Sequence, residues 1–229
     1  MRQKFFNDKF MAALGRSYLI PCQFWNKGDE EFYAKNILPS FKRFMKDLLP
    51  RLKKVDSRIV DDFNQIQISC KNRNSYILPS GEIIEVGAVI TPKTPEPGQP
   101  VMGMVFGFTP KKIILAGGYF GLNGDEVEAI RQAAEDSKNR LNLLYDNDEF
   151  TESFGIDGFC RSKHGITQGR CVLILNENFA GVAGEIPARF ITDEILPEII
   201  IAHYKGVKVV NRFLTKALKH VSSIHKITV

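Results

Sequence analysis

The stretch Gln65-Ile-Gln-Ile-Ser-Cys70 is where the apolar pattern of this chain changes from a helical period to a period of two. Every second residue in it is apolar or cysteine, which is typical of a strand with one buried face. Three further segments, residues 83–90, 101–108 and 113–116, are short, rich in Val, Ile and Phe, and bounded by turn residues. Because the connections between consecutive segments are short, hairpins are favoured over crossovers. These patterns therefore predict an antiparallel sheet in the middle of the chain.

On the N-terminal side of this sheet, apolar residues between positions 31 and 55 recur at helical spacing. Pro39 suits the first turn of a helix, whereas Pro50 should kink or end one. We therefore expect a short helix before Pro39, a main helix to about residue 49, and one further turn.

Between the predicted strands at 83–90 and 101–108, residues 92–100 contain four prolines and a glycine, and predict an exposed hairpin loop.

On the C-terminal side of the sheet, the pattern becomes helical again. We expect a helix from residue 126 to about residue 145, with Asp125 and Glu128 at the spacing of a capping box. A strand at residues 172–175 and two helical pieces separated by Gly206 should follow.

Helix, sheet and helix follow one another without a break in composition, which favours one α+β domain over residues 1–229. The antiparallel sheet lies in the middle of the chain and is flanked by N- and C-terminal helices. Residues 1–28 could form an N-terminal extension to this domain.

The composition of the 229 residues is that of a globular protein, with 44% hydrophobic and 25% charged residues. An excess of 31 Lys and Arg over 26 Asp and Glu gives a net charge of +5, which permits an anionic partner without requiring one. Polar residues interrupt the apolar start of the chain, which argues against a signal peptide, and the apolar run at residues 199–202 is too short to span a bilayer. We expect a soluble, cytoplasmic protein with no membrane partner.

The four cysteines include no CxxC pair, and with no export signal expected we expect them to be reduced and partly buried. The histidines form no metal-ligand motif, and no cofactor or metal is expected. The acidic pairs Asp61 with Asp62 and Glu82 with Glu85 lack the downstream lysine of many metal-dependent nucleases. Their spacing therefore selects none of them as a catalytic group.

A glycine-rich segment, Gly117-Gly-Tyr-Phe-Gly-Leu-Asn-Gly124, lies between a predicted strand and a predicted helix. Such a turn can cradle a phosphate at the helix N-terminus. However, neither GxGxxG nor GxxxxGK[ST] is present, and Asp125, Glu126 and Glu128 would repel an anion there. We interpret the segment as a tight turn followed by a helix cap.

A second candidate site is the loop at residues 158–170, which concentrates Arg161, Lys163, His164 and Arg170 between glycines. Its side chains could clamp a phosphate or a carboxylate through charge-assisted hydrogen bonds. His164 is the candidate catalytic residue, because an imidazole can give or take a proton near neutral pH. The alternative is a solvated polar loop without a ligand.

A third candidate site is the basic stripe, which we define as Lys208, Arg212, Lys216 and Lys219 on the last predicted helix. Spacings of four, four and three residues place these cations on one helical face. Such a stripe can follow a nucleic-acid backbone. The alternative is the wet side of an ordinary amphipathic helix.

Three stretches, taken in order, carry a resemblance to a known family: Glu30-Glu-Phe-Tyr-Ala-Lys-Asn-Ile-Leu-Pro-Ser-Phe41, Gly117-Gly-Tyr-Phe120, and Asn178-Phe179 with Arg212-Phe-Leu214. They resemble the bacterial domain of unknown function 2461 family over about residues 29–218. The family's Arg-Asp-x-Arg-Phe-Ser-x-x-Lys-x-Pro-Tyr-Lys-like stretch is reduced here to Ser69, Lys71 and Tyr76. The resemblance implies the fold and a bacterial or phage-like origin, and it carries no biochemical function.

Two functions are compatible with these patterns. The leading hypothesis is a non-catalytic binding protein whose basic face meets an anionic partner, either nucleic acid or another protein. The alternative is an enzyme that acts on a phosphorylated or carboxylated small molecule through the loop at residues 161–170.

Overall fold

The computed structural model describes residues 3–68, 76–77, 83–92, 99–136, 166–168, 171–176 and 178–225. The chain divides into two compact units. The first unit comprises Met1–Ile90, Val105–Ile114 and Glu185–Ile201. The second comprises Thr91–Met104, Leu115–Gly184 and Ala202–Val229.

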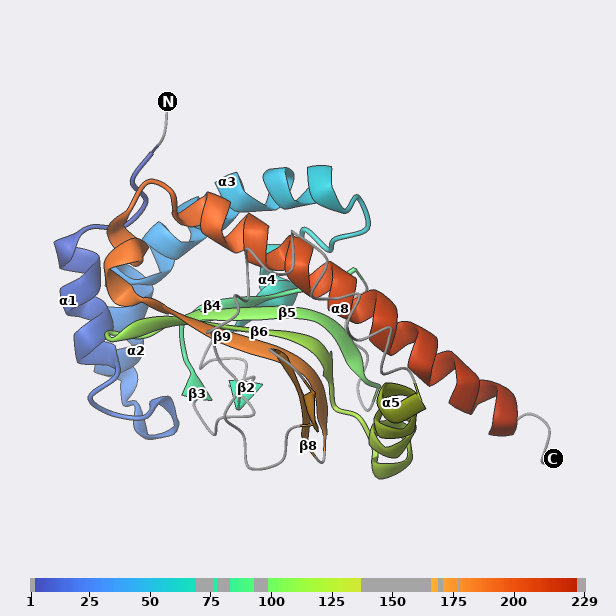
Figure 1. The fold of residues 1–229 in the computed structure, drawn as a ribbon. Helices are drawn as coiled ribbons and strands as arrows, with labels where there is room; N and C mark the ends of the chain where they lie inside the picture. The colour runs from blue at the N-terminus through green and yellow to red at the C-terminus, as the bar shows by residue number, and fades with distance from the viewer. Residues whose placement is uncertain are drawn as a thin grey trace. The chain divides into compact units, whose positions relative to one another are not determined.

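Along the chain, N-terminal helices are followed by strands, then by a helix, further strands and the C-terminal helix (Figure 1). The helices are α1 (Asp8–Ser17), η1 (Cys22–Phe24), α2 (Lys27–Asn36), α3 (Leu38–Val55), α4 (Phe63–Ile66), α5 (Gly124–Asp136), η3 (Ala188–Thr192) and α8 (Leu196–His225). The strands are β1 (Gln67–Ile68), β2 (Tyr76–Ile77), β3 (Ile83–Ile84), β4 (Gly87–Ile90), β5 (Val101–Phe108), β6 (Lys112–Phe120), β7 (Ile166–Gln168), β8 (Cys171–Asn176) and β9 (Phe179–Pro187).

The larger sheet has the strand order β1-β4-β5-β6-β9-β8-β7, and β2 pairs with β3 in a separate two-stranded sheet. Pairing is antiparallel, with Gln67 opposite Ala88 and Ile174 opposite Gly181. The predicted α+β class, with a central antiparallel sheet flanked by helices, is therefore confirmed.

The strand expected at residues 83–90 is broken in the structure. The chain bends at Glu85 and Val86, so that β3 joins the small sheet and β4 joins the large one. The N–H of Phe108 donates to the carbonyl of Val86 at 2.8 Å, which ties the bend to β5. The strand expected from Gln65 begins later than predicted, because Ile66 ends α4 and β1 begins at Gln67, while residues 69 and 70 lie outside the described residues.

Aromatic side chains fill the core of the first unit. Phe41 and Phe44 of α3 and Phe106 and Phe108 of β5 are fully buried, and their ring centroids lie 5.6–6.4 Å apart. Phe6, just before α1, joins them with its ring 5.3 Å from that of Phe108. Edge-on and tilted aromatic contacts of this kind add to the free energy gained by apolar burial. This cluster holds α3 and the chain before α1 against β5.

The two prolines of α3 have different positions. Pro39 lies in the first turn, as expected, where its missing N–H costs no hydrogen bond. Pro50 lies inside the helix, which continues to Val55. The prediction that the main helix would end before Pro50 is wrong, because buried Leu48, Leu49 and Leu52 keep this part of α3 packed.

Glycines bring the strands and the last helix of the second unit close together. Gly117 and Gly118 lie inside β6, so their interpretation as part of a turn was wrong. An added Cβ on Gly117 would lie 2.1 Å from Cγ2 of Val207 in α8, and one on Gly118 would lie 2.0 Å from the carbonyl oxygen of Ala180 in β9. Only glycine permits both approaches.

The helix after β6 is capped earlier than expected. The Asn123 side chain accepts from the N–H of Glu126, and the Glu126 side chain accepts from the N–H of Asn123, both at 2.9 Å. The capping box is therefore Asn123 with Glu126, and not Asp125 with Glu128. Helix α5 extends to Asp136, and the rest of the helix expected to residue 145 lies outside the described residues, as do residues 93–98 of the predicted proline-rich loop.

The C-terminal helix is continuous. Helix α8 runs from Leu196 to His225 through Gly206, so the prediction of two pieces is wrong (Figure 1). A glycine inside a helix costs about 1 kcal/mol relative to alanine. Burial of the neighbouring Tyr204, Val207 and Val210 offsets this cost.

Candidate functional site

The basic stripe lies on α8 as predicted from its spacing. At 100° per residue, Lys208, Arg212, Lys216 and Lys219 fall within an arc of about 80°. Arg212, Lys216 and Lys219 are exposed, and Lys208 is half-buried. Lys205 precedes Lys208 by three residues, is half-buried and extends the same face. Lys205 is not among the residues predicted for the stripe, although its spacing of three residues from Lys208 indicates the same face.

The opposite face of α8 is buried in the second unit. Val207, Val210, Leu214 and Ala217 are each at most 5% exposed. The close approach of Val207 to Gly117 places this face directly on β6. The apolar face fixes the rotation of the helix about its axis, so the stripe is turned away from the sheet.

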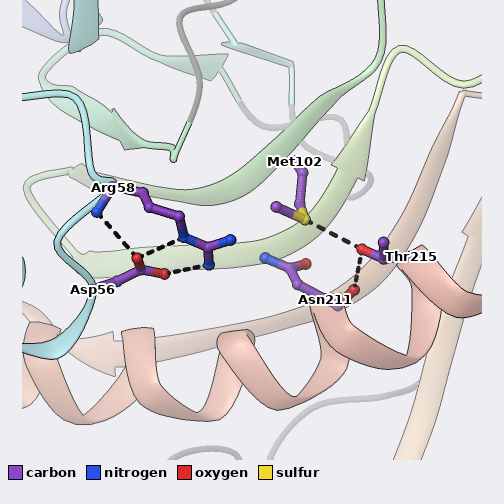
Figure 2. A network of polar contacts seen from close by, with 5 residues as sticks. All are labelled: Asp56, Arg58, Met102, Asn211 and Thr215. Carbon is purple, nitrogen blue, oxygen red and sulfur yellow. Dashed lines mark hydrogen bonds and ion pairs between the residues drawn. The ribbon is translucent and has the colours of Figure 1, made fainter.

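A polar network also connects α8 to the sheet of the second unit. The hydroxyls of Tyr119 in β6 and Thr215 in α8 lie 2.8 Å apart, and Thr215 also donates to the Asn211 carbonyl at 2.7 Å. Figure 2 shows Thr215 between this carbonyl and the sulfur of Met102 in β5, which lies 3.5 Å from the hydroxyl. Because these contacts lie within one turn of Arg212 and Lys216, they hold that part of the stripe in place.

Asn211 itself is buried, and its side-chain oxygen has no hydrogen-bond partner in the described ranges. Nothing in the sequence pattern singled out this residue or Tyr119. Both lie among apolar positions, and only their tertiary packing brings them together.

The charge around the stripe is one-sided. No Asp or Glu follows Glu198 in the sequence, and Glu198 forms an ion pair with Arg51 of α3 at 2.9 Å. Arg212 and Lys216 form no ion pair with any residue in the described ranges. The outer face of α8 therefore carries cations that its own helix cannot neutralise.

The glycine-rich candidate does not form a phosphate cradle. Gly117 and Gly118 are strand residues in close contact, and Gly121, with φ of 79°, forms the turn. The N–H of Glu126 is already bonded to the Asn123 side chain, and Asp125 and Glu126 place negative charge in the first turn of α5. The interpretation as a turn followed by a cap describes Gly121 to Glu126, though not the first two glycines.

The residues of the second candidate, Arg161, Lys163, His164 and Arg170, lie outside the described residues. Cys70 and Cys160 lie outside them too, and Cys22 is a free, partly buried thiol. Within the described ranges, no three His, Cys, Asp or Glu side chains gather in a way that could hold a metal ion. None of the helices that the structure describes combines the length and the apolar character needed to cross a bilayer.

Comparisons with known proteins give no further direction. The chain matches no family model, no curated protein and no solved structure. Its resemblance to the domain of unknown function 2461 family therefore stays a prediction.

Proposed function

We propose that the protein is a non-catalytic binding protein that holds the phosphate backbone of a nucleic acid on the outer face of α8. One observation carries the proposal. A helix fixed to its sheet by buried side chains presents exposed Arg212 and Lys216, which have no ion pair among the described residues. The solvent-exposed face of an ordinary amphipathic helix carries both positive and negative side chains, whereas α8 has no Asp or Glu after Glu198.

The length of the stripe suits a polyanion. From Lys208 to Lys219 the helix rises about 17 Å at 1.5 Å per residue. Double-stranded DNA carries about one negative charge per 1.7 Å of its axis, so cations at successive turns of α8 can each meet a phosphate. Contacts from Lys and Arg to phosphates position a nucleic acid without reading its sequence. We therefore expect binding that depends little on base sequence.

The test is a binding assay with fluorescently labelled DNA and RNA oligonucleotides at low salt. The double variant Arg212→Ala/Lys216→Ala should lose about tenfold or more in affinity, because two phosphate contacts disappear. The matched control is Lys27→Ala/Lys35→Ala, which removes the same charge from exposed positions of α2 in the first unit. The control should bind nearly as well as the wild type.

Two outcomes would contradict the proposal. One is that the wild type binds none of the oligonucleotides even at low salt, where the attraction between cations and phosphates is strongest. The other is that both double variants weaken binding equally, because the effect would then come from net charge and not from the stripe.

The alternative function, an enzyme acting through Arg161, Lys163, His164 and Arg170, stays a prediction, because these residues lie outside the described ranges. The proposed binding also implies a location where nucleic acid is present. We therefore keep the cytoplasm as the proposed location.

A further inference from the structure

The loop between α1 and α2 has an unusual surface. Leu19 is 80% exposed and Phe24 is 68% exposed, and Ile20 between them is also exposed. No side chain from Leu19 to Phe24 is buried. Beyond this loop, Trp25 packs against Tyr33 of α2 with their ring centroids 5.3 Å apart. Apolar burial therefore does not hold residues 19–24 against the rest of the first unit.

The loop is joined through Glu85 to the bend between β3 and β4. The N–H of Cys22 donates to Oε1 of Glu85 at 3.1 Å. At the start of the loop, the hydroxyl of Tyr18 donates to the carbonyl of Phe108 at 2.9 Å and accepts from the N–H of Glu85 at 3.2 Å. The other hydrogen bonds that residues 19–24 make in the described part of the chain are local to α1 and the loop. One carboxyl thus holds the middle of the loop.

This carboxyl is in a poor environment for a charge. Glu85 is only 5% exposed, and its buried Oε2 has no hydrogen-bond partner among the residues that the structure describes. Burial raises the pKa of Glu85, and the hydrogen bond from the Cys22 N–H opposes that shift without cancelling it. The titratable side chains on the segments bonded to Glu85 are the Tyr18 phenol and the Cys22 thiol. No described Lys or Arg forms an ion pair with Glu85.

We propose that residues 19–24 form a loop that opens from the bend between β3 and β4 when the Glu85 carboxyl gives up its proton to solvent. In the closed state an ionised Glu85 would be buried, with one carboxylate oxygen lacking a hydrogen bond. Opening the loop hydrates the carboxylate, at the cost of one hydrogen bond from Cys22 and little apolar contact. The proposal concerns the first unit alone and does not depend on the binding function of α8.

The direction of the pH dependence follows from linkage. The pKa of Glu85 is raised in the closed state and returns toward its ordinary value in the open state, so protons favour closure. Between the ordinary pKa of a glutamate and the raised pKa of Glu85 in the closed state, the open population should grow by about tenfold per pH unit. At pH values above that raised pKa, the open population should become constant.

Hydrogen exchange of the Cys22 amide measures this opening directly, because that N–H is the one bonded to Glu85. The rate should be followed by NMR from about pH 4 to about pH 8 in the wild type and in Glu85→Gln, whose side-chain oxygen can accept the same bond but cannot ionise. The ratio of the two rates cancels the intrinsic pH dependence of exchange. The ratio of wild type to variant should be near one at the acidic end and rise with pH.

A second variant separates ionisation from the simple loss of a contact. Tyr18→Phe removes the hydroxyl that bonds to Phe108 and Glu85 but leaves the carboxyl in place. It should speed exchange and keep the rise with pH. A wild-type to Glu85→Gln ratio that stays constant with pH would overturn the proposal. A ratio that falls with pH would also overturn the proposal. In that case the hydrogen bond from the Cys22 N–H would stabilise the ionised carboxylate in the closed state by more than burial destabilises it.

Discussion

At the scale of single residues, the second unit depends on the absence of a side chain at Gly117. This residue lies in β6 directly beneath Val207, which is fully buried on the inner face of α8. Its neighbour Gly118 has φ of 150°, a conformation that other residues rarely adopt. A pair of glycines in a sequence usually indicates a turn. Here the pair marks the places where a helix and a neighbouring strand touch the backbone of β6.

We expect Gly117→Ala to destabilise the protein by about 1–3 kcal/mol, because overpacked sites must shift backbone or side chains. The same substitution should cost less in a Val207→Ala background, in which the two closest atoms, Cγ1 and Cγ2 of Val207, are absent. Chemical denaturation of the four proteins of this double-mutant cycle measures the coupling. Strictly additive costs would show that Gly117 and Val207 do not touch.

At the scale of helices and strands, the sequence predicted best where local pattern and tertiary packing agree. Strand β5 was predicted over its full range because its Val and Phe residues suit a buried strand. Strand β9 was missed, because Phe-Ala-Gly-Val-Ala-Gly is poor in strand-forming residues. Gly181 in β9 must be small, since an added Cβ would lie 2.1 Å from the carbonyl oxygen of Gly117. Packing requirements of this kind are invisible in a local pattern.

The two prolines of α3 provide a matched pair for testing the cost of a helix-interior proline. Both are exposed, and Pro50 lies inside the helix whereas Pro39 lies in its first turn. Pro50→Ala should stabilise the protein by about 1–3 kcal/mol, because it restores a backbone donor and relieves a ring clash. Pro39→Ala should change the stability by less than about 1 kcal/mol. Thermal and urea unfolding measure both, and equal effects would contradict the assigned positions.

The attachment of α8 can be tested at Leu214, which is fully buried. Leu214→Ala should cost about 2–5 kcal/mol, as other large-to-small changes in protein cores do. The exposed neighbour Lys216 is the control, and Lys216→Ala should stay within about 0.5 kcal/mol of the wild type. A Leu214→Ala variant as stable as Lys216→Ala would mean that α8 is not packed through this face.

At the scale of the whole molecule, the excess of positive charge is unevenly distributed along the chain. The net charge is +5, and no acidic residue follows Glu198. The sequence predicted the basic stripe because helical spacing is a local property that survives folding. The sequence did not predict the half-burial of Lys208, nor the network of Tyr119, Thr215 and Asn211, because these depend on how α8 meets β5 and β6.

The most direct test of the central claim is the salt dependence of nucleic-acid binding. For the wild type, the logarithm of the binding constant should fall linearly with the logarithm of the salt concentration, with a slope of roughly −0.7 to −0.9 per phosphate contact. Replacing Arg212 and Lys216 by alanine should make that slope less steep by the contribution of about two phosphate contacts. The control variant Lys27→Ala/Lys35→Ala should leave the slope unchanged. A slope that is the same in all three proteins would contradict a phosphate-binding face on α8.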